Sequence, residues 1–353
     1  MSPAAAPPPS TRLPVMSLIA VSVLAACATP SADPSLSAAS ASQATATRAP
    51  SPTASASAPA SVEDRAEAIF EDIAGEPDWP LEGFGSLWLL APDSEEPSLL
   101  RVDPATNEIV ASIVLPGSVC QGFTMSDDAV WACTTTGVVR IDPETNAITH
   151  EVAFEAGPAF GSLAFGSGSV WALGADGGAL NQLVRIDPVA MTSTTIALGH
   201  GSSTLAYGFD AVWVTALQDG TVLRVDPATD EVTAFATGLP RPQVLSVGPD
   251  SLWVTLQRAE DVAPDEPTVV RIDPNDGAVV AEIPTGATPF HIWADTDAVW
   301  VCSRDLFLAR IDPATNEVVE TLTGPPSTCA VTVAFDSVWA TAGNALKVYR
   351  FAP

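Results

Sequence analysis

The sequence predicts an all-β protein, a seven-bladed β-propeller. Two markers recur along the chain at intervals of about 40 residues, which is the sign of a repeated structural unit. The first is a tryptophan preceded by a short apolar residue, and it occurs at Trp88, Trp131, Trp171, Trp213, Trp253, Trp300 and Trp339. The second is the arginine of an Arg-Ile/Val-Asp-Pro phrase, with a degenerate last copy, at Arg101, Arg140, Arg185, Arg224, Arg271, Arg310 and Arg350. Both markers count seven units.

Each unit has the pattern of four short strands. In the sixth unit, "HIWAD", "DAVWVC", "LFLARID" and "NEVVETL" are apolar or alternating, and turn residues separate them. Four short strands per repeat are typical of a propeller blade. Seven such blades close into a ring that leaves no long exposed sheet edge.

The repeated phrase is predicted to be structural, since a catalytic group would not be needed once in every blade. In "RIDPATNEVV", residues 310–319, the Asp312 carboxylate can accept hydrogen bonds from backbone N–H groups just ahead, and Pro313 presets φ for the turn. Asn316 suits a left-handed exit from that turn. We expect the repeated arginine to pair with a nearby acidic group, such as the Asp that precedes the Trp in "DDAVW". The Trp should fill the space between blades.

Ring closure requires a strand from elsewhere in the chain. The seventh unit supplies three strands and no fourth, outer strand. The segment 66–77, "AEAIFEDIAGEP", aligns with the end of a unit and is the candidate. The rival interpretation is an amphipathic helix that begins after Ser61, with Val62, Ala66, Phe70 and Ile73 on one face. Local propensity favours the helix, but the missing strand leads us to expect that the segment completes the last blade.

The cysteines predict two disulfides. Cys27 apart, the chain has Cys120, Cys133, Cys302 and Cys329, an even set that favours disulfides in an exported protein. Cys120 and Cys133 lie symmetrically about a turn of blade two, so they should face each other in a hairpin. Cys302 and Cys329 lie toward the same face in blades six and seven. There is no Cys-x-x-Cys pair, so we do not expect zinc.

The N-terminus predicts export and a lipid anchor. Residues 1–26 contain a short apolar run that ends in Leu-Ala-Ala before Cys27, which resembles the bacterial lipobox with its acylated cysteine. A plain secretory signal is the alternative, and the start is Met1 or Met16. Residues 27–60, rich in Ala, Ser, Thr and Pro, should form a disordered tether. The propeller is then expected over 61–353, on the extracytoplasmic face of a bacterial cell membrane.

The charge excludes one class of partner. The 353 residues include 14 basic and 42 acidic side chains, a net charge of −28. So acidic a protein repels nucleic acid and anionic headgroups. We expect the lipid bilayer to hold the acylated Cys27. We also expect the protein to be a monomer that binds an unidentified protein or small-molecule ligand.

The repeats, with "AVWV" and "RIDPATNEVV", are similar to the YVTN-repeat propellers of bacterial envelopes and to streptogramin (virginiamycin B) lyase-like propellers. The similarity spans about 66–353. It implies either a binding or scaffold module, or a metal-dependent lyase or hydrolase acting at the channel. Of the lyase's repeat motifs, only "TPFHIW", with His291, approaches one. The lyase repeats also carry Trp-Phe-Thr-Glu at the Trp, whereas two residues after each Trp this chain has neither Glu nor His. We therefore expect a binding module rather than an enzyme, with the lyase as the alternative; a sensor or accessory domain of an envelope complex is a further interpretation.

The candidate site residues are those that depart from the repeat and lie on the loops of one face. These are His200, Arg241, Arg258, Asp261, His291, Arg304 and Asp305. Glu260, Trp79 and Phe160 share this face. The sequence assigns no catalytic residue, metal ligand or cofactor. Enzymatic use of a divalent cation would require His291 and a carboxylate such as Asp261 or Asp305 to meet within about 5 Å.

Overall fold

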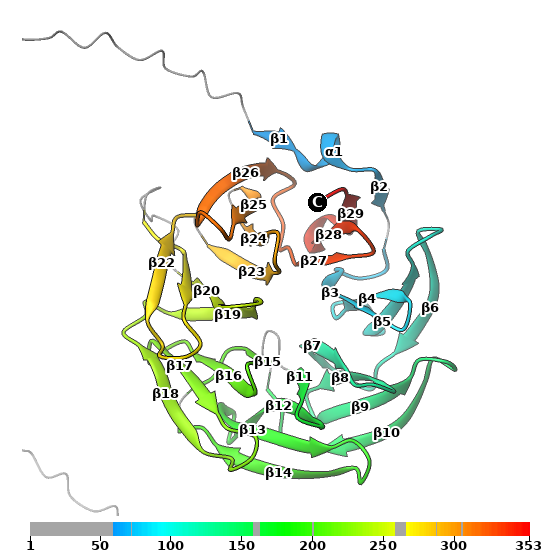
Figure 1. Cartoon of the computed structure of the whole chain (residues 1–353). Helices are drawn as coiled ribbons and strands as arrows, with labels where there is room; N and C mark the ends of the chain where they lie inside the picture. The colour runs from blue at the N-terminus through cyan, green and yellow to red at the C-terminus, as the bar shows by residue number, and fades with distance from the viewer. Residues whose placement is uncertain are drawn as a thin grey trace, which may run out of the picture. The chain divides into compact units, whose positions relative to one another are not determined.

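The computed structural model describes residues 59–71, 73–157, 163–199, 201–257, 266–286, 288–304 and 306–353. Over these residues the chain forms seven four-stranded antiparallel blades arranged in a ring (Figure 1), which confirms the predicted fold class. The predicted signal peptide, Cys27 and nearly all of the tether lie outside the described residues. No helix in the described part of the chain has the length and apolar character needed to cross a membrane.

The blades follow one another along the chain, each from an inner to an outer strand. The first three are β3 (Asp78–Gly83), β4 (Ser86–Ala91), β5 (Ser98–Asp103) and β6 (Glu108–Val114); β7 (Val119–Met125), β8 (Val130–Thr134), β9 (Gly137–Asp142) and β10 (Ala147–Ala153); and β11 (Leu163–Gly166), β12 (Ser169–Asp176), β13 (Ala179–Asp187) and β14 (Thr192–Ala197). The next two are β15 (Leu205–Gly208), β16 (Ala211–Ala216), β17 (Thr221–Val225) and β18 (Val232–Thr237); and β19 (Pro242–Val247), β20 (Leu252–Leu256), β21 (Val269–Ile272) and β22 (Val279–Ile283).

The last two blades include strands from the N-terminal part of the chain. Blade six is β23 (Pro289–Ala294), β24 (Val299–Ser303), β25 (Phe307–Asp312) and β26 (Glu317–Thr323), with β1 (Ala60–Ser61) added at its outer edge. Blade seven is β27 (Val331–Ala334), β28 (Ser337–Ala342) and β29 (Lys347–Phe351), with β2 (Ala68–Phe70) as its outer strand. A 3₁₀ turn, η1 (Gly343–Ala345), joins β28 to β29.

The two sequence markers face each other in every blade. Trp88 pairs with Arg101, Trp300 with Arg310 and Trp339 with Arg350, and the other four blades have the same register. All seven indoles are buried between blades, as predicted. In five blades the guanidinium lies over the indole, for example 4.8 Å from the ring centre for Arg350 on Trp339. The marker pair is thus a packing unit that builds the interface between blades.

The Asp-Pro turn is formed as predicted. The Asp312 carboxylate accepts the Ala314 N–H at 2.8 Å, and Asn316 leaves the turn with φ 59°. In blade two, the backbone N–H groups of Thr145 and Glu144 hold the pKa of Asp142 below its usual value. The turn is therefore a backbone device and not a reactive site.

The repeated arginines make contacts that the sequence did not predict, in addition to the expected ion pairs. The expected ion pair with the preceding Asp is present in Arg140–Asp128, at 2.8 Å, and Arg271–Asp250, at 2.9 Å. In blades one, three, five and seven, however, the guanidinium also reaches the Asp-Pro turn of the next blade. Arg271 donates to Pro313 O at 2.7 Å and to Asn316 Oδ1 at 2.9 Å. These arginines join neighbouring blades.

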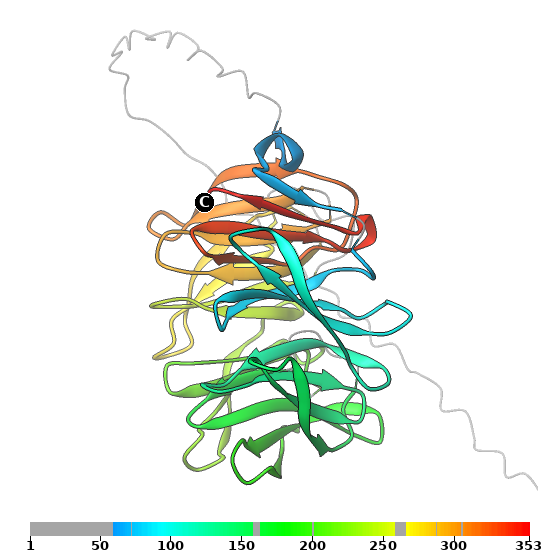
Figure 2. The same ribbon diagram turned by 90° about the vertical axis from the view of Figure 1, so that its right-hand side faces the viewer.

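The N-terminal segment closes the ring. β2 pairs antiparallel with β29, with Ala68 opposite Arg350 and Phe70 opposite Val348, which confirms the predicted fourth strand. The rival helix is reduced to one turn, α1 (Val62–Arg65), with Ser61 Oγ accepting the Asp64 N–H at 3.1 Å. Figures 1 and 2 show β1, α1 and β2, in blue, lying along the orange and red strands of blades six and seven.

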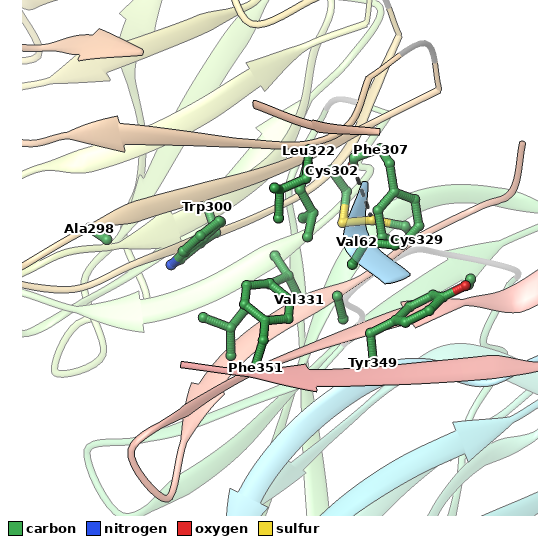
Figure 3. Packing of buried hydrophobic residues seen from close by; sticks show 14 residues of the cluster. Val62, Ala298, Trp300, Cys302, Phe307, Leu322, Cys329, Val331, Tyr349 and Phe351 are labelled. Atoms are coloured by element: carbon green, nitrogen blue, oxygen red, sulfur yellow. Dashed lines mark hydrogen bonds between the residues drawn. A yellow bond between two sulfur atoms is a disulfide. The ribbon is translucent and has the colours of Figure 1, made fainter. Parts of the chain in front are cut away.

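Both predicted disulfides are present. Cys120 and Cys133 are joined within blade two, with Cα atoms 5.4 Å apart. Cys302 and Cys329, with Cα atoms 5.7 Å apart, link blade six to blade seven. Val62 packs into the same hydrophobic cluster as the second disulfide (Figure 3), so the ring closure is held by a covalent link, a strand and a buried side chain together.

Candidate ligand-binding channel

A channel runs between the inner strands and contains a cavity of about 290 Å³. Its wall is mostly apolar because the inner strands turn large hydrophobic side chains toward the axis. The main apolar lining residues are Trp79, Leu81, Phe123, Leu163, Phe165, Leu205, Tyr207, Leu245, Val247, Ile292, Trp293 and Val331. Polar groups enter at Thr124, Ser246 and His291. Concave apolar sites with few polar groups are typical of small-ligand binding.

Trp79 lies across this channel. It packs against the cluster of blades one and two and also against the cluster that contains Val244 and Ile292 of blades five and six. Its ring meets the His291 imidazole edge-on, with ring centres 4.6 Å apart. The Trp79 backbone has φ 49°, a conformation that is costly for a bulky side chain. Strained residues of this kind gather at ligand sites, where the surroundings hold them in place.

His291 is a neutral hydrogen-bond donor in this structure. Its side chain is buried in β23, and Nδ1 accepts the backbone N–H of Val331 at 3.3 Å. Burial lowers the pKa of His291 to about 3. Because Nδ1 is the acceptor, the proton resides on Nε2. The sequence identified this residue but not its partner or its charge state.

Asp78, which the sequence did not single out, is a titratable residue next to Trp79 of the channel lining. It is the first residue of β3, and its Oδ1 accepts the N–H of Trp79 at 2.9 Å. Burial, together with the nearby carboxylates of Asp93 and Glu76, raises the pKa of Asp78 to about 6, although the hydrogen bond from the Trp79 N–H acts in the opposite direction. Its position next to Trp79, where the chain enters the inner strand, was the available signal in the sequence.

The β4–β5 loop of blade one gives a negative surface to the face of the ring on which the loops between second and third strands lie. Two open hollows of about 840 and 860 Å³ flank the β4–β5 loop. Asp93, Glu95 and Glu96 of that loop line both, and Glu76 lines the second. A negative surface near the channel repels anions and favours neutral or cationic molecules.

The structure brings His291, but not the two described arginines, into the channel lining. Arg241 donates to Gln257 Oε1 at 2.6 Å within blade five and to Gln218 Oε1 at 3.5 Å in blade four. The Arg304 guanidinium lies 5.3 Å from the centre of the Phe290 ring. His200, Arg258, Asp261 and Asp305 lie outside the described residues, as do Glu260 and Phe160. The predicted approach of His291 to Asp261 or Asp305 therefore stays a prediction.

Among the residues that the structure describes, no three His, Cys, Asp or Glu side chains gather as metal ligands do. The neutral His291, with Nδ1 occupied by a backbone N–H, presents a donor rather than a free lone pair. The arrangement seen here is suited to binding a molecule with an acceptor group.

Solved structures with a similar fold include a lyase, a synthase and a WD40 domain. A streptogramin B lyase matches with TM-score 0.66 and 18% identity, over 80% of this chain and 96% of the lyase chain. Kuenenia stuttgartiensis hydrazine synthase matches with TM-score 0.66 and 13% identity, over 80% and 97% of the two chains. The Neurospora crassa Pan2 WD40 domain gives 0.60 and 14%, over 78% and 89%.

These identities show a shared fold, and the resemblance to the lyase is confirmed at that level. No family model matches the chain. No curated protein matches it either.

Proposed function

We propose that this protein is a lipid-anchored, extracytoplasmic binding module whose propeller holds a small ligand at the mouth of its channel. The observation that carries the proposal is the position of Trp79, which crosses the channel in a left-handed backbone conformation and rests on His291. A side chain so placed lies across the apolar channel. It also offers a large aromatic face to a ligand that displaces it or stacks on it.

The lining defines the chemistry of that ligand. The apolar wall would bury an aliphatic or aromatic body. The Nε2–H of neutral His291 would donate to one acceptor oxygen or nitrogen of the ligand, and the acidic loops of blade one would disfavour anions. The expected ligand is therefore a neutral or cationic, largely apolar molecule with one hydrogen-bond acceptor.

The placement in the envelope rests on the sequence and agrees with the disulfides. Two disulfides in a small set of cysteines are typical of exported proteins. Acylated Cys27 would anchor the chain, and residues 27–60 would hold the propeller away from the bilayer. Metabolic labelling with a palmitate analogue would test the anchor: label should enter the wild type and be absent from Cys27→Ser.

The binding function is tested by thermal shift with a panel of neutral, cationic and anionic aromatic molecules, because ligands of the folded state raise the Tm. We expect the neutral or cationic members to shift the wild type and to lose most of that shift in Trp79→Gly. Phe84→Gly is the matched control: Phe84 also has positive φ, 51°, but follows the opposite end of β3. Absence of any shift, or equal shifts in both variants, would contradict the proposal.

A further inference from the structure

A further hollow lies on the opposite face of the ring, where the loops between first and second strands gather. Its volume is about 290 Å³, and residues of blades one, six and seven line it. Glu82, Asp295, Asp297 and Asp336 supply carboxylates, and Trp300 and Arg310 form part of the wall. Two buried N–H donors of this wall have no acceptor among the residues that the structure describes.

The first donor is the indole N–H of Trp300. In five of the other six blades the equivalent N–H donates to the residue five positions earlier, for example Trp88 to Gly83 O at 2.9 Å and Trp339 to Ala334 O at 3.0 Å. Trp131, Trp171 and Trp213 do the same. Trp300 is fully buried, yet its Nε1 has no partner. Figure 3 shows this nitrogen turned away from Phe351 and the disulfide, on the side of Ala298, which also lines the hollow.

The second donor is the Nε–H of Arg310. In blades one, three, five and seven the arginine Nε donates to a serine hydroxyl, at 2.7–3.0 Å, and the serines are Ser86, Ser169, Ser251 and Ser337. Blade six has Ala298 at this position, and Arg310 Nε is buried without an acceptor. The same replacement in blade two, Ala129, leaves Arg140 Nε unpartnered as well. The arginine donor is thus unpaired because a hydroxyl is missing.

Buried donors without acceptors are rare, because each loses its hydrogen bonds to water on folding. A ligand in the hollow that carries acceptor oxygens would offer these donors the hydrogen bonds that the protein does not supply. An anion alone would meet the four carboxylates, and a cation alone would leave the donors unpaired. The hollow is larger than the volume of one or two waters. A molecule that carries a carboxylate and an ammonium group meets both requirements.

We infer that this hollow is a binding site for a small zwitterion of the α-amino acid class. The ligand carboxylate accepts from Trp300 Nε1–H and Arg310 Nε–H. The ligand ammonium group faces the carboxylates of Glu82, Asp295, Asp297 and Asp336. This site is separate from the channel and does not depend on the function proposed for it.

The test is calorimetric titration of the full-length protein with free amino acids, each compared with its N-acetyl and its C-terminal amide derivative. We expect the zwitterions to bind, and binding to weaken by about tenfold or more when either charge is removed, which is the scale of one charged hydrogen bond. Absence of binding by every zwitterion, with the hollow holding water only, would overturn the inference.

One conservative variant locates the site. Ala298→Ser introduces the hydroxyl found in four other blades, gives Arg310 Nε an internal acceptor and should weaken zwitterion binding by about tenfold. Ala129→Ser makes the same repair in blade two, away from the hollow, and should leave the affinity unchanged. Trp79→Gly should leave it unchanged as well, which separates this site from the channel. Equal affinities in the two serine variants would overturn the assignment.

Discussion

Arg350 donates from Nη1 to the Asn107 side chain at 2.8 Å, and so joins the last blade to the first. The same arginine donates from Nε to Ser337 and stacks on Trp339. Arg101, Arg185 and Arg271 make equivalent contacts with the turn of the next blade. Blades two, four and six, where alanine replaces the serine, lack this contact among the described residues. The ring is therefore joined by an alternating set of arginine bridges, one of which closes it.

We expect Arg350→Lys to destabilise the protein by about 2–3 kcal/mol, because a lysine cannot keep the stacking and the forked hydrogen bonds together. Urea unfolding of the purified protein measures this change. Arg224→Lys is the control, since Arg224 has an ion pair of 3.9 Å within its own blade and no bridge to the next one. Equal losses in the two variants would show that the bridge contributes nothing.

We expect Ala129→Ser to stabilise the fold by about 1 kcal/mol, because the new hydroxyl would accept from the buried Nε of Arg140. Differential scanning calorimetry would show a higher Tm. Ala211→Ser is the matched control: it makes the same change beside Arg224, whose Nε is not among the buried donors without a partner. A rise in both variants, or in neither, would contradict the explanation.

We expect loss of the inter-blade disulfide, in Cys302→Ala with Cys329→Ala, to cost about 3–4 kcal/mol, the entropic scale for a loop of this length. The loss should also loosen the ring closure, because the disulfide and Val62 share one cluster. Hydrogen exchange should accelerate in β2 and β29. The double alanine variant of Cys120 and Cys133 should leave exchange in these two strands unchanged.

Val62 offers an independent test of the closure. Its side chain is fully buried between blades six and seven. We expect Val62→Ala to cost about 1–3 kcal/mol through the lost methyl contacts and the cavity left behind. Val110, which is 54% exposed on β6, supplies the control substitution Val110→Ala, for which urea unfolding should show little change.

The pH dependence of stability should show two opposing contributions at the channel. His291 has its pKa lowered from 6.5 to about 3, so the unfolded state binds more protons between these values and stability is lost as pH falls through that window. Asp78 has its pKa raised from 3.8 to about 6, so the native state binds more protons and stability is lost as pH rises from about 4 to about 6.

Urea unfolding at pH 4, 5, 6 and 7 separates the two contributions. Relative to the wild type, Asp78→Asn should gain stability as pH rises through this range, and His291→Gln should gain stability as pH falls. Parallel profiles for wild type and both variants would show that neither group is buried in the way described here.

The sequence by itself determined the repeated parts of this protein. The spacing of Trp and Arg gave seven blades, the Asp-Pro phrase gave the turn, and the count of strands in the last unit called for the segment that became β2. The positions of the cysteines in the repeat also predicted both disulfides. These features could be predicted because each depends on hydrogen bonds and side-chain alternation within one blade, or on counting copies of it.

Only the tertiary structure decided which groups meet across blades. Trp79 reaches His291, and Arg350 reaches Asn107, because the curvature of the ring brings together residues that the repeat keeps far apart in sequence. The charge state of Asp78 depends on burial that no local pattern encodes. The unpaired Nε1 of Trp300 could not be predicted either, because whether a buried donor meets an acceptor depends on its surroundings in the folded ring.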